Sequence, residues 1–123
     1  MAKMRFSARD AAETMLNRYW DGTLPVNIEI FADREGIAVS EMTNCNGAKW
    51  RPDLEEIIID GNMPGPERRE CVAMALGEAC GVNPEDFAME ILAPIRAGRE
   101  ETAGALALKF GLRKTFAEKI LAK

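Results

Sequence analysis

Residues 57–81 read IIIDGNMPGPERRECVAMALGEACG, and this stretch decides the fold class. The β-branched run Ile57–Ile59 is typical of a strand. The segment Asp60–Gly65 is rich in turn-forming residues and ends that strand. Pro66 fits the first position of a helix, which the pattern extends through Cys80 before Gly81 stops it. A strand, a turn and a long helix therefore form the centre of the predicted fold.

The residues before this stretch predict two helices and two further strands. Ser7 can cap a helix that begins near Ala8, and its apolar face continues to Tyr19. A second short helix is predicted at about residues 25–35, with Gly36 as its C-terminal stop. Strand-like residues at 37–42 and 48–51 flank a polar turn at 44–47. With Ile57–Ile59 they predict a small antiparallel sheet of three short strands.

The residues after Gly81 predict helices to the end of the chain. One helix opens at Asn83 or Pro84 and closes at Gly98, and two more are predicted at residues 100–110 and 112–121. The order of helices, small sheet and helices defines an α+β fold, with N-terminal helices, an antiparallel sheet and a C-terminal helical bundle. The length of 123 residues and the absence of a linker or repeat predict a single domain over 1–123.

Composition limits the classes of function. The net charge of −4 argues against broad nucleic-acid affinity, because phosphate binding is driven by clustered Lys and Arg. Cys45, Cys71 and Cys80 are odd in number and form no CxxC pair, so free thiols in a reducing setting are expected. For Cys71 and Cys80, burial is favoured over a redox role. The N-terminal residues lack the apolar core of a secretory signal, and no stretch approaches the length of a membrane span. We therefore expect a cytoplasmic protein without membrane contact.

Several segments occur in the order that one family of proteins shows. In that family a proline-led segment is followed by a Gly-Ile-x-Val strand and then by an apolar strand that ends in a polar turn. An Arg-rich helix comes next. The last two patterns are Phe-Ala-x-x-Leu-Leu-x-Pro and, in the tail, Leu-Ala-x-x-Phe-x-Val. The matching residues are Leu24–Val26, Gly36–Val39, Ile57–Asn62, Glu67–Glu78, Phe87–Pro94 and Leu106–Leu112. Over roughly residues 8–121 the chain thus resembles the ImmA/IrrE family of zinc-peptidase-like proteins.

The resemblance implies a zinc site that this chain lacks. The family's core helix carries Ala-His-Glu-Leu-Gly-His, in which two histidines four residues apart hold zinc and the glutamate is the general base. Ala73, Leu76 and Gly77 match that pattern, but Met74, Ala75 and Glu78 occupy the three functional positions, and the chain contains no histidine. A thioether is a poor ligand for hydrolytic zinc, and alanine cannot accept a proton.

The third-ligand region is altered as well. Asn83 stands about where the family has a ligand carboxylate, and Glu85 and Asp86 are out of register. A repurposed metal site made of Glu78 with Glu85 or Asp86 is the alternative to an ordinary amphipathic helix with Met74 in the core. We favour the ordinary helix, and expect no metal, no cofactor and no peptidase activity.

Two other groups of residues are candidates for binding. Trp50, between Lys49 and Arg51, is either an exposed interface anchor or a half-buried core residue, with neither favoured. Arg113 and Lys114 would open the recognition helix if residues 100–121 formed a helix-turn-helix motif. The favoured alternative is that these two helices pack on the core.

These observations lead to two main hypotheses of function. The first is a non-catalytic protein-interaction protein, encoded by a phage or mobile element, that binds a helix-turn-helix repressor or a host defence protein as an antirepressor or inhibitor. This follows from the resemblance, because the active relatives act on such repressors. The alternative is a DNA-binding transcriptional regulator that uses residues 100–121. An enzyme with a repurposed site around Glu78 is a third and weaker possibility.

Overall fold

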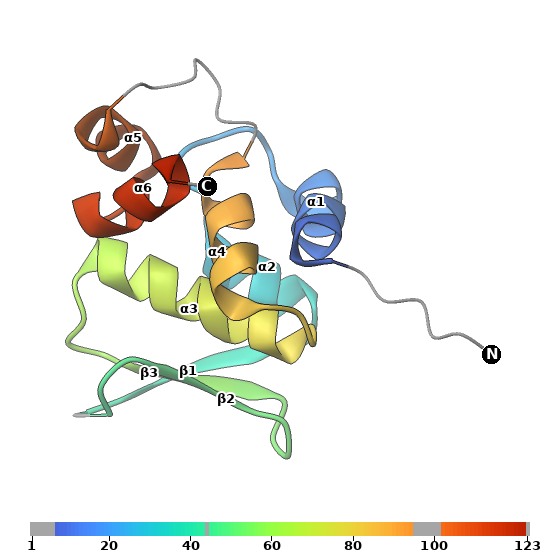
Figure 1. The fold of residues 1–123 in the computed structure, drawn as a ribbon. Helices are drawn as coiled ribbons and strands as arrows, with labels where there is room; N and C mark the ends of the chain where they lie inside the picture. The colour runs from blue at the N-terminus through green and yellow to red at the C-terminus, as the bar shows by residue number, and fades with distance from the viewer. Residues whose placement is uncertain (1–6, 44, 95–101, 123) are drawn as a thin grey trace.

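The computed structural model describes residues 7–43, 45–94 and 102–122, and within them the α+β class is confirmed. Helices lie on one side of a small sheet, whose other face carries no described helix (Figure 1). The elements in chain order are α1 Ala8–Tyr19, α2 Ile28–Arg34, β1 Ala38–Met42, β2 Ala48–Arg51, β3 Glu56–Asp60, α3 Gly65–Ala79, α4 Pro84–Leu92, α5 Ala103–Phe110 and α6 Lys114–Leu121.

The sheet is mixed, so the prediction of a purely antiparallel sheet was wrong. The strand order is β1-β3-β2, with β2 antiparallel and β1 parallel to β3. The physical reason is the apolar character of β3, in which Ile57 and Ile59 are completely buried. A central position gives this strand hydrogen-bonded neighbours on both sides and places both isoleucines under α3. The chain therefore crosses from β1 to the far edge and returns through the middle.

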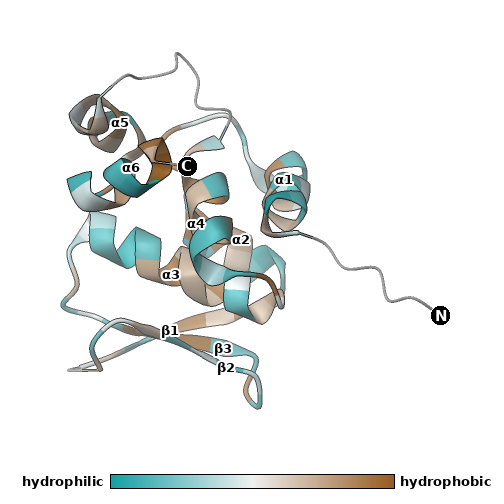
Figure 2. Ribbon diagram, viewed as in Figure 1, coloured by the Kyte–Doolittle hydropathy of each residue, from teal (hydrophilic) through white to brown (hydrophobic). Residues whose placement is uncertain are grey.

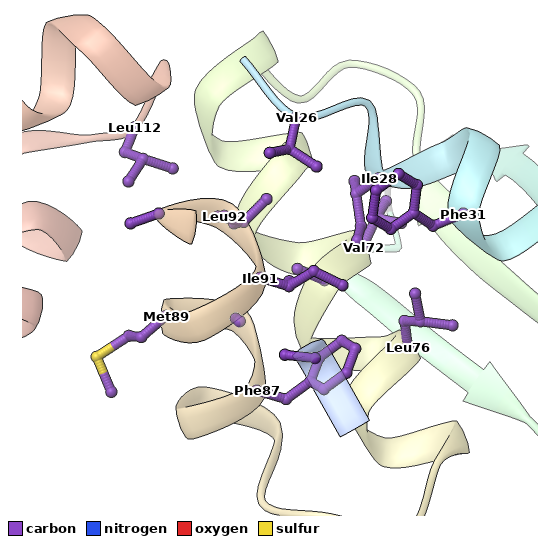
Figure 3. Close-up of a cluster of buried hydrophobic side chains, with 14 of the residues drawn as sticks. Val26, Ile28, Phe31, Val72, Leu76, Phe87, Met89, Ile91, Leu92 and Leu112 are labelled. Atoms are coloured by element: carbon purple, nitrogen blue, oxygen red, sulfur yellow. The ribbon is translucent and has the colours of Figure 1, made fainter. Parts of the chain in front are cut away.

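The core lies between the sheet, α3 and the helices packed on α3. Val72 and Leu76 of α3, Phe87 and Ile91 of α4, and Phe31 of α2 are buried and point toward one another (Figure 3). A domain of this length can bury roughly two-thirds of the surface that its unfolded chain exposes, and the cluster fits that expectation.

The first two helices begin after residues whose side chains cap them. Ser7 accepts a hydrogen bond from the N–H of Asp10 at 3.1 Å, as predicted for the start of α1. The second helix begins at Ile28 rather than near residue 25, because Asn27 caps it through the N–H of Ile30 at 3.4 Å.

The fourth helix is shorter than predicted. It ends at Leu92 rather than at Gly98, because Ala93 precedes Pro94 and adopts φ −123° and ψ 63°, outside the helical region. Gly98 itself lies outside the described residues.

The C-terminal pair of helices, α5 and α6, lies over the N-terminal end of α3 (Figure 1). Both begin two or three residues later than predicted, at Ala103 and Lys114, and Glu100 lies outside the described residues. Gly111 ends α5 with φ +64°, a conformation that favours glycine. None of the described helices is long and apolar enough to cross a membrane.

Candidate functional site

The positions that replace the zinc motif lie on α3. Met74 is half-buried and packs against the core, Ala75 is buried, and Glu78 is exposed. With Cys71 and Glu67, Met74 and Glu78 recur at helical spacing and share one face of α3. This face therefore presents one thioether, one thiol and two carboxylates.

The residues near the third-ligand position have other partners. The side chain of Asn83 caps α4 by accepting from the N–H of Asp86 at 3.0 Å. Glu85 pairs with Lys119 of α6 at 3.0 Å. Within the described ranges, no three His, Cys, Asp or Glu side chains are grouped as metal ligands.

The structure separates Trp50 from its two basic neighbours. Trp50 pairs with Ile57 of β3, so its side chain lies on the sheet face that is covered by α3. It is half-buried and packs against the core, which is the second of the two alternatives left open for it. Lys49 and Arg51 lie on the opposite, open face, where Arg51 pairs with Asp53 at 3.1 Å.

The backbone of β2 is unpaired on its outer side in the described chain, because β2 is an edge strand. The N–H of Asp60 donates to the carbonyl of Gly47 at 3.0 Å, and this bond identifies which residues of β2 turn their backbone groups toward β3. In an antiparallel pair, successive residues direct their N–H and C=O groups alternately toward and away from the neighbouring strand. Lys49 and Arg51 therefore direct these groups toward β3. Ala48 and Trp50 direct theirs outward.

A band of half-buried apolar side chains follows the line where α3 packs on β2 and β3. We name it the α3–β2 seam, and its members are Ala48, Trp50, Met63, Cys71 and Met74. At the N-terminal end of α3 it opens into a hollow of about 340 Å³, which Gly47, Met63, Glu67 and Cys71 help to line. The free backbone groups of Ala48 and Trp50 thus adjoin an apolar band and a hollow.

Arg113, which would contact DNA in a helix-turn-helix arrangement, is held by a buried carboxylate. Its Nε and Nη2 atoms each lie 2.7 Å from Glu70 Oε1, and its backbone N–H donates to Oε2 at 2.8 Å. Glu70 is only 1% exposed, and its hydrogen bond raises the pKa of Arg113. Lys114 is exposed at the start of α6. Both residues are exposed, but the guanidinium of Arg113 is already bound by Glu70.

Sequence reasoning missed the residue that joins three elements. Arg68 of α3 donates to Glu29 of α2 at 2.7 and 3.1 Å and to Glu41 of β1 at 2.8 Å. The hydrogen bonds to Glu29 are the main reason why the pKa of Arg68 is raised. No local pattern pointed to these contacts, since the partners are 39 and 27 residues away.

Cys71 and Cys80 are less buried than predicted. Cys45 and Cys71 are half-buried, and Cys80 is exposed because it caps the C-terminal end of α3. Partial desolvation raises the pKa of Cys71 and raises that of Cys80 to about 11. Both thiols are therefore protonated and weakly nucleophilic at neutral pH.

Comparisons with known proteins give a likeness of fold. No protein-family model and no curated protein matches the chain. The fold is similar to that of a Mycobacterium tuberculosis transcriptional regulator of known structure, with a TM-score of 0.67 and 17% sequence identity. The match covers 89% of this chain and 44% of the regulator, so this chain corresponds to less than half of that protein. At this level of identity the likeness concerns the fold alone.

Proposed function

We propose that this chain is a non-enzymatic, protein-binding module in the control of transcription, which holds an extended segment of its partner along β2. The observation that carries the proposal is the row of outward N–H and C=O groups at Ala48 and Trp50, next to the α3–β2 seam. An added strand satisfies such groups, while side-chain pockets beside the edge supply specificity. The similar fold of a transcriptional regulator supports the regulatory setting.

The absence of catalysis is part of this proposal. Met74 and Ala75 supply neither a zinc ligand of the usual type nor a general base, and the chain has no histidine to replace them. The resemblance to the ImmA/IrrE family suggests the setting and partner: a phage or mobile element, and a helix-turn-helix repressor or a host defence protein.

The side chains of β2 specify the chemistry of the bound segment. Every second residue of that segment would face the α3 side, beside Trp50 and the seam, and should be apolar. The intervening residues would face the open side, beside Lys49. This lysine is exposed, and no ion pair between described residues includes it, so an acidic residue is favoured opposite. The expected partner segment therefore alternates apolar and acidic residues.

A peptide titration tests this function. A short capped peptide of alternating valine and glutamate should shift the backbone amide resonances of Ala48 and Trp50 most. It should bind more tightly than the same peptide with lysine in place of glutamate. The variant Lys49→Glu should reverse this preference, by about three- to fivefold for one cross-strand charge pair.

A backbone variant provides the control for this titration. Ala48→Pro removes one outward N–H while the groups of Lys49 that bond β3 remain, so the fold should be kept and binding should weaken about fivefold. If neither peptide moves the β2 resonances, or if Ala48→Pro binds as well as the wild type, the proposal is wrong.

DNA binding by α5 and α6 is the second candidate. It is favoured by the short turn between the two helices, by the exposed Lys114 and by the similar fold of a transcriptional regulator. The net charge of −4 and the pairing of Arg113 with Glu70 oppose it. Duplex DNA should then bind with a steep salt dependence, and Lys114→Ala should reduce the slope by about one unit. The absence of binding at low salt would exclude this candidate.

A further inference from the structure

The other edge of the sheet, β1, also has unpaired backbone groups. The N–H of Ala38 donates to the carbonyl of Glu55 at 3.3 Å, and the carbonyl of Met42 accepts from the N–H of Gly61 at 3.2 Å. These bonds fix the phase of the parallel β1–β3 ladder, in which Ala38, Ser40 and Met42 face β3. Val39 and Glu41 therefore direct their N–H and C=O groups outward, and no other described segment bonds to them.

The two edges differ in whether they can pair with themselves. An antiparallel pair of β2 strands related by a twofold axis makes the most hydrogen bonds within the strand when it centres on Lys49, because Ala48 of each copy then exchanges hydrogen bonds with Trp50 of the other. The two Lys49 side chains would then lie directly opposite each other, where like charges are destabilising. Such a lysine is a usual protection of an edge strand against self-association.

The β1 edge carries no such obstacle. A twofold axis at Ser40 lets Val39 of each copy exchange two hydrogen bonds with Glu41 of the other. On the open face this register places Ser40 opposite Ser40, and Ala38 opposite Met42. No pair of like charges is directly opposed, and each Glu41 carboxylate is already paired with Arg68 at 2.8 Å.

Exposed apolar side chains accompany this edge. Met42 is 53% exposed on β1, and Ile30 is 45% exposed on α2. The α2 helix runs along β1, since Arg68 joins Glu29 to Glu41 at one end and Ile37 bonds to Ala32 at the other. A second copy would cover Met42 with Ala38 of its own β1.

We propose that β1 is a homodimer interface, where two copies of this chain pair antiparallel about Ser40 and join their sheets into one. Each copy then keeps its β2 edge at the outer end of the joined sheet. The dimer goes beyond the proposed function, because it involves β1 and does not depend on peptide binding at β2.

The mass of the wild-type chain in solution is the first test. Sedimentation equilibrium should give twice 13.6 kDa at concentrations where the dimer is populated. Ser40→Lys should weaken the dimer about fivefold, since it opposes two lysines at the axis. Within each copy this lysine can pair with Glu56, which now accepts the Ser40 hydroxyl at 2.5 Å, so the variant should fold. A wild-type chain that stays monomeric at about 100 µM, well above typical dissociation constants of stable dimers, would overturn the proposal.

Cysteine cross-linking tests the register. In a background without the three native cysteines, Ser40→Cys should form a covalent dimer on mild oxidation, because opposed residues of a non-hydrogen-bonded pair meet the distance of a disulfide. Met42→Cys is the matched control on the same exposed strand and should remain monomeric, because the proposed register places residue 42 opposite Ala38 of the other copy. Equal cross-linking at both positions, or none at Ser40→Cys, contradicts the proposed interface. Peptide binding at β2 is measured separately, so either proposal can fail alone.

Discussion

Replacement of Arg113 by alanine should lower the free energy of unfolding by about 3 kcal/mol, because it leaves a buried carboxylate without its partner. Glu70 is 1% exposed and receives the guanidinium of Arg113 at 2.7 Å. The backbone N–H of Arg113 would still bond to Glu70 Oε2, and the arginine side chain itself is 48% exposed. The site can therefore admit some water, so we expect the lower end of the range known for broken buried pairs.

Urea denaturation of four proteins measures this effect. Arg113→Lys keeps the positive charge but loses the two-pronged contact, so it should fall between the wild type and Arg113→Ala. The double variant Glu70→Leu with Arg113→Ala has no buried charge and should be more stable than Arg113→Ala alone. A loss below about 1 kcal/mol for Arg113→Ala would show that the pair behaves as an exposed salt bridge.

The same unfolding measurements distinguish a structural role of Arg113 from a role in DNA binding. If the side chain served DNA binding alone, its removal would leave the stability unchanged and reduce only the affinity for DNA. The structure instead makes it one of several ties between α3 and the C-terminal pair. Arg69 contributes another, through its hydrogen bond to the carbonyl of Gly111. Hydrophilic colours mark these first turns of α3 below α6 in Figure 2.

Local signals explain how much of the fold could be predicted. The cap at Ser7, the stop at Gly81 and the β-branched run of β3 each act within a few residues, and each was found in the sequence. The direction of β1 relative to β3 depends on which strand takes the centre of the sheet, which is decided by burial under α3. No short-range pattern carries that information, and the sheet was therefore predicted with the wrong topology.

The candidate site could be predicted only in part for the same reason. Trp50, Lys49 and Arg51 were grouped in the sequence as one candidate for binding, although alternation along a strand places Trp50 on the face opposite the other two. The hydrogen-bond phase that turns the backbone of Ala48 outward depends on the pairing with β3. Likewise, Glu70 lies 43 residues from Arg113, so the sequence showed a free basic residue where the structure has a bonded one.

Several of the residues that carry the resemblance to the ImmA/IrrE family are packing residues in this structure. Ala73, Leu76, Phe87 and Ala88 are all completely buried between α3 and α4. Buried residues in this pattern are what a close contact between two helices requires. The requirement is the same whichever side chains the exposed face of α3 carries. Such a pattern reflects helix packing and assigns no activity by itself, which is why the proposed function rests on the β2 edge instead.

Gly77 shows most directly what that packing requires. A Cβ atom placed on Gly77 would lie 2.8 Å from the Cβ of Phe87 and 3.0 Å from its Cγ and Cδ2 atoms. Phe87 is completely buried, so its ring has no free space into which it could move. The two helices can approach this closely only because residue 77 has no side chain.

Gly77→Ala should therefore destabilise the protein by about 2 kcal/mol, even though alanine favours a helix by about 1 kcal/mol over glycine. Gly104→Ala is the matched control, because it lies within α5 and its added Cβ would meet nothing within 4 Å. It should gain up to about 1 kcal/mol from helix propensity alone. Adding Phe87→Leu to Gly77→Ala should cost less than the sum of the two single changes, since the smaller side chain relieves the clash. Thermal and urea unfolding of these variants measure all three values. An equal gain at Gly77 and Gly104 would mean that α3 and α4 do not approach as closely as the contact requires.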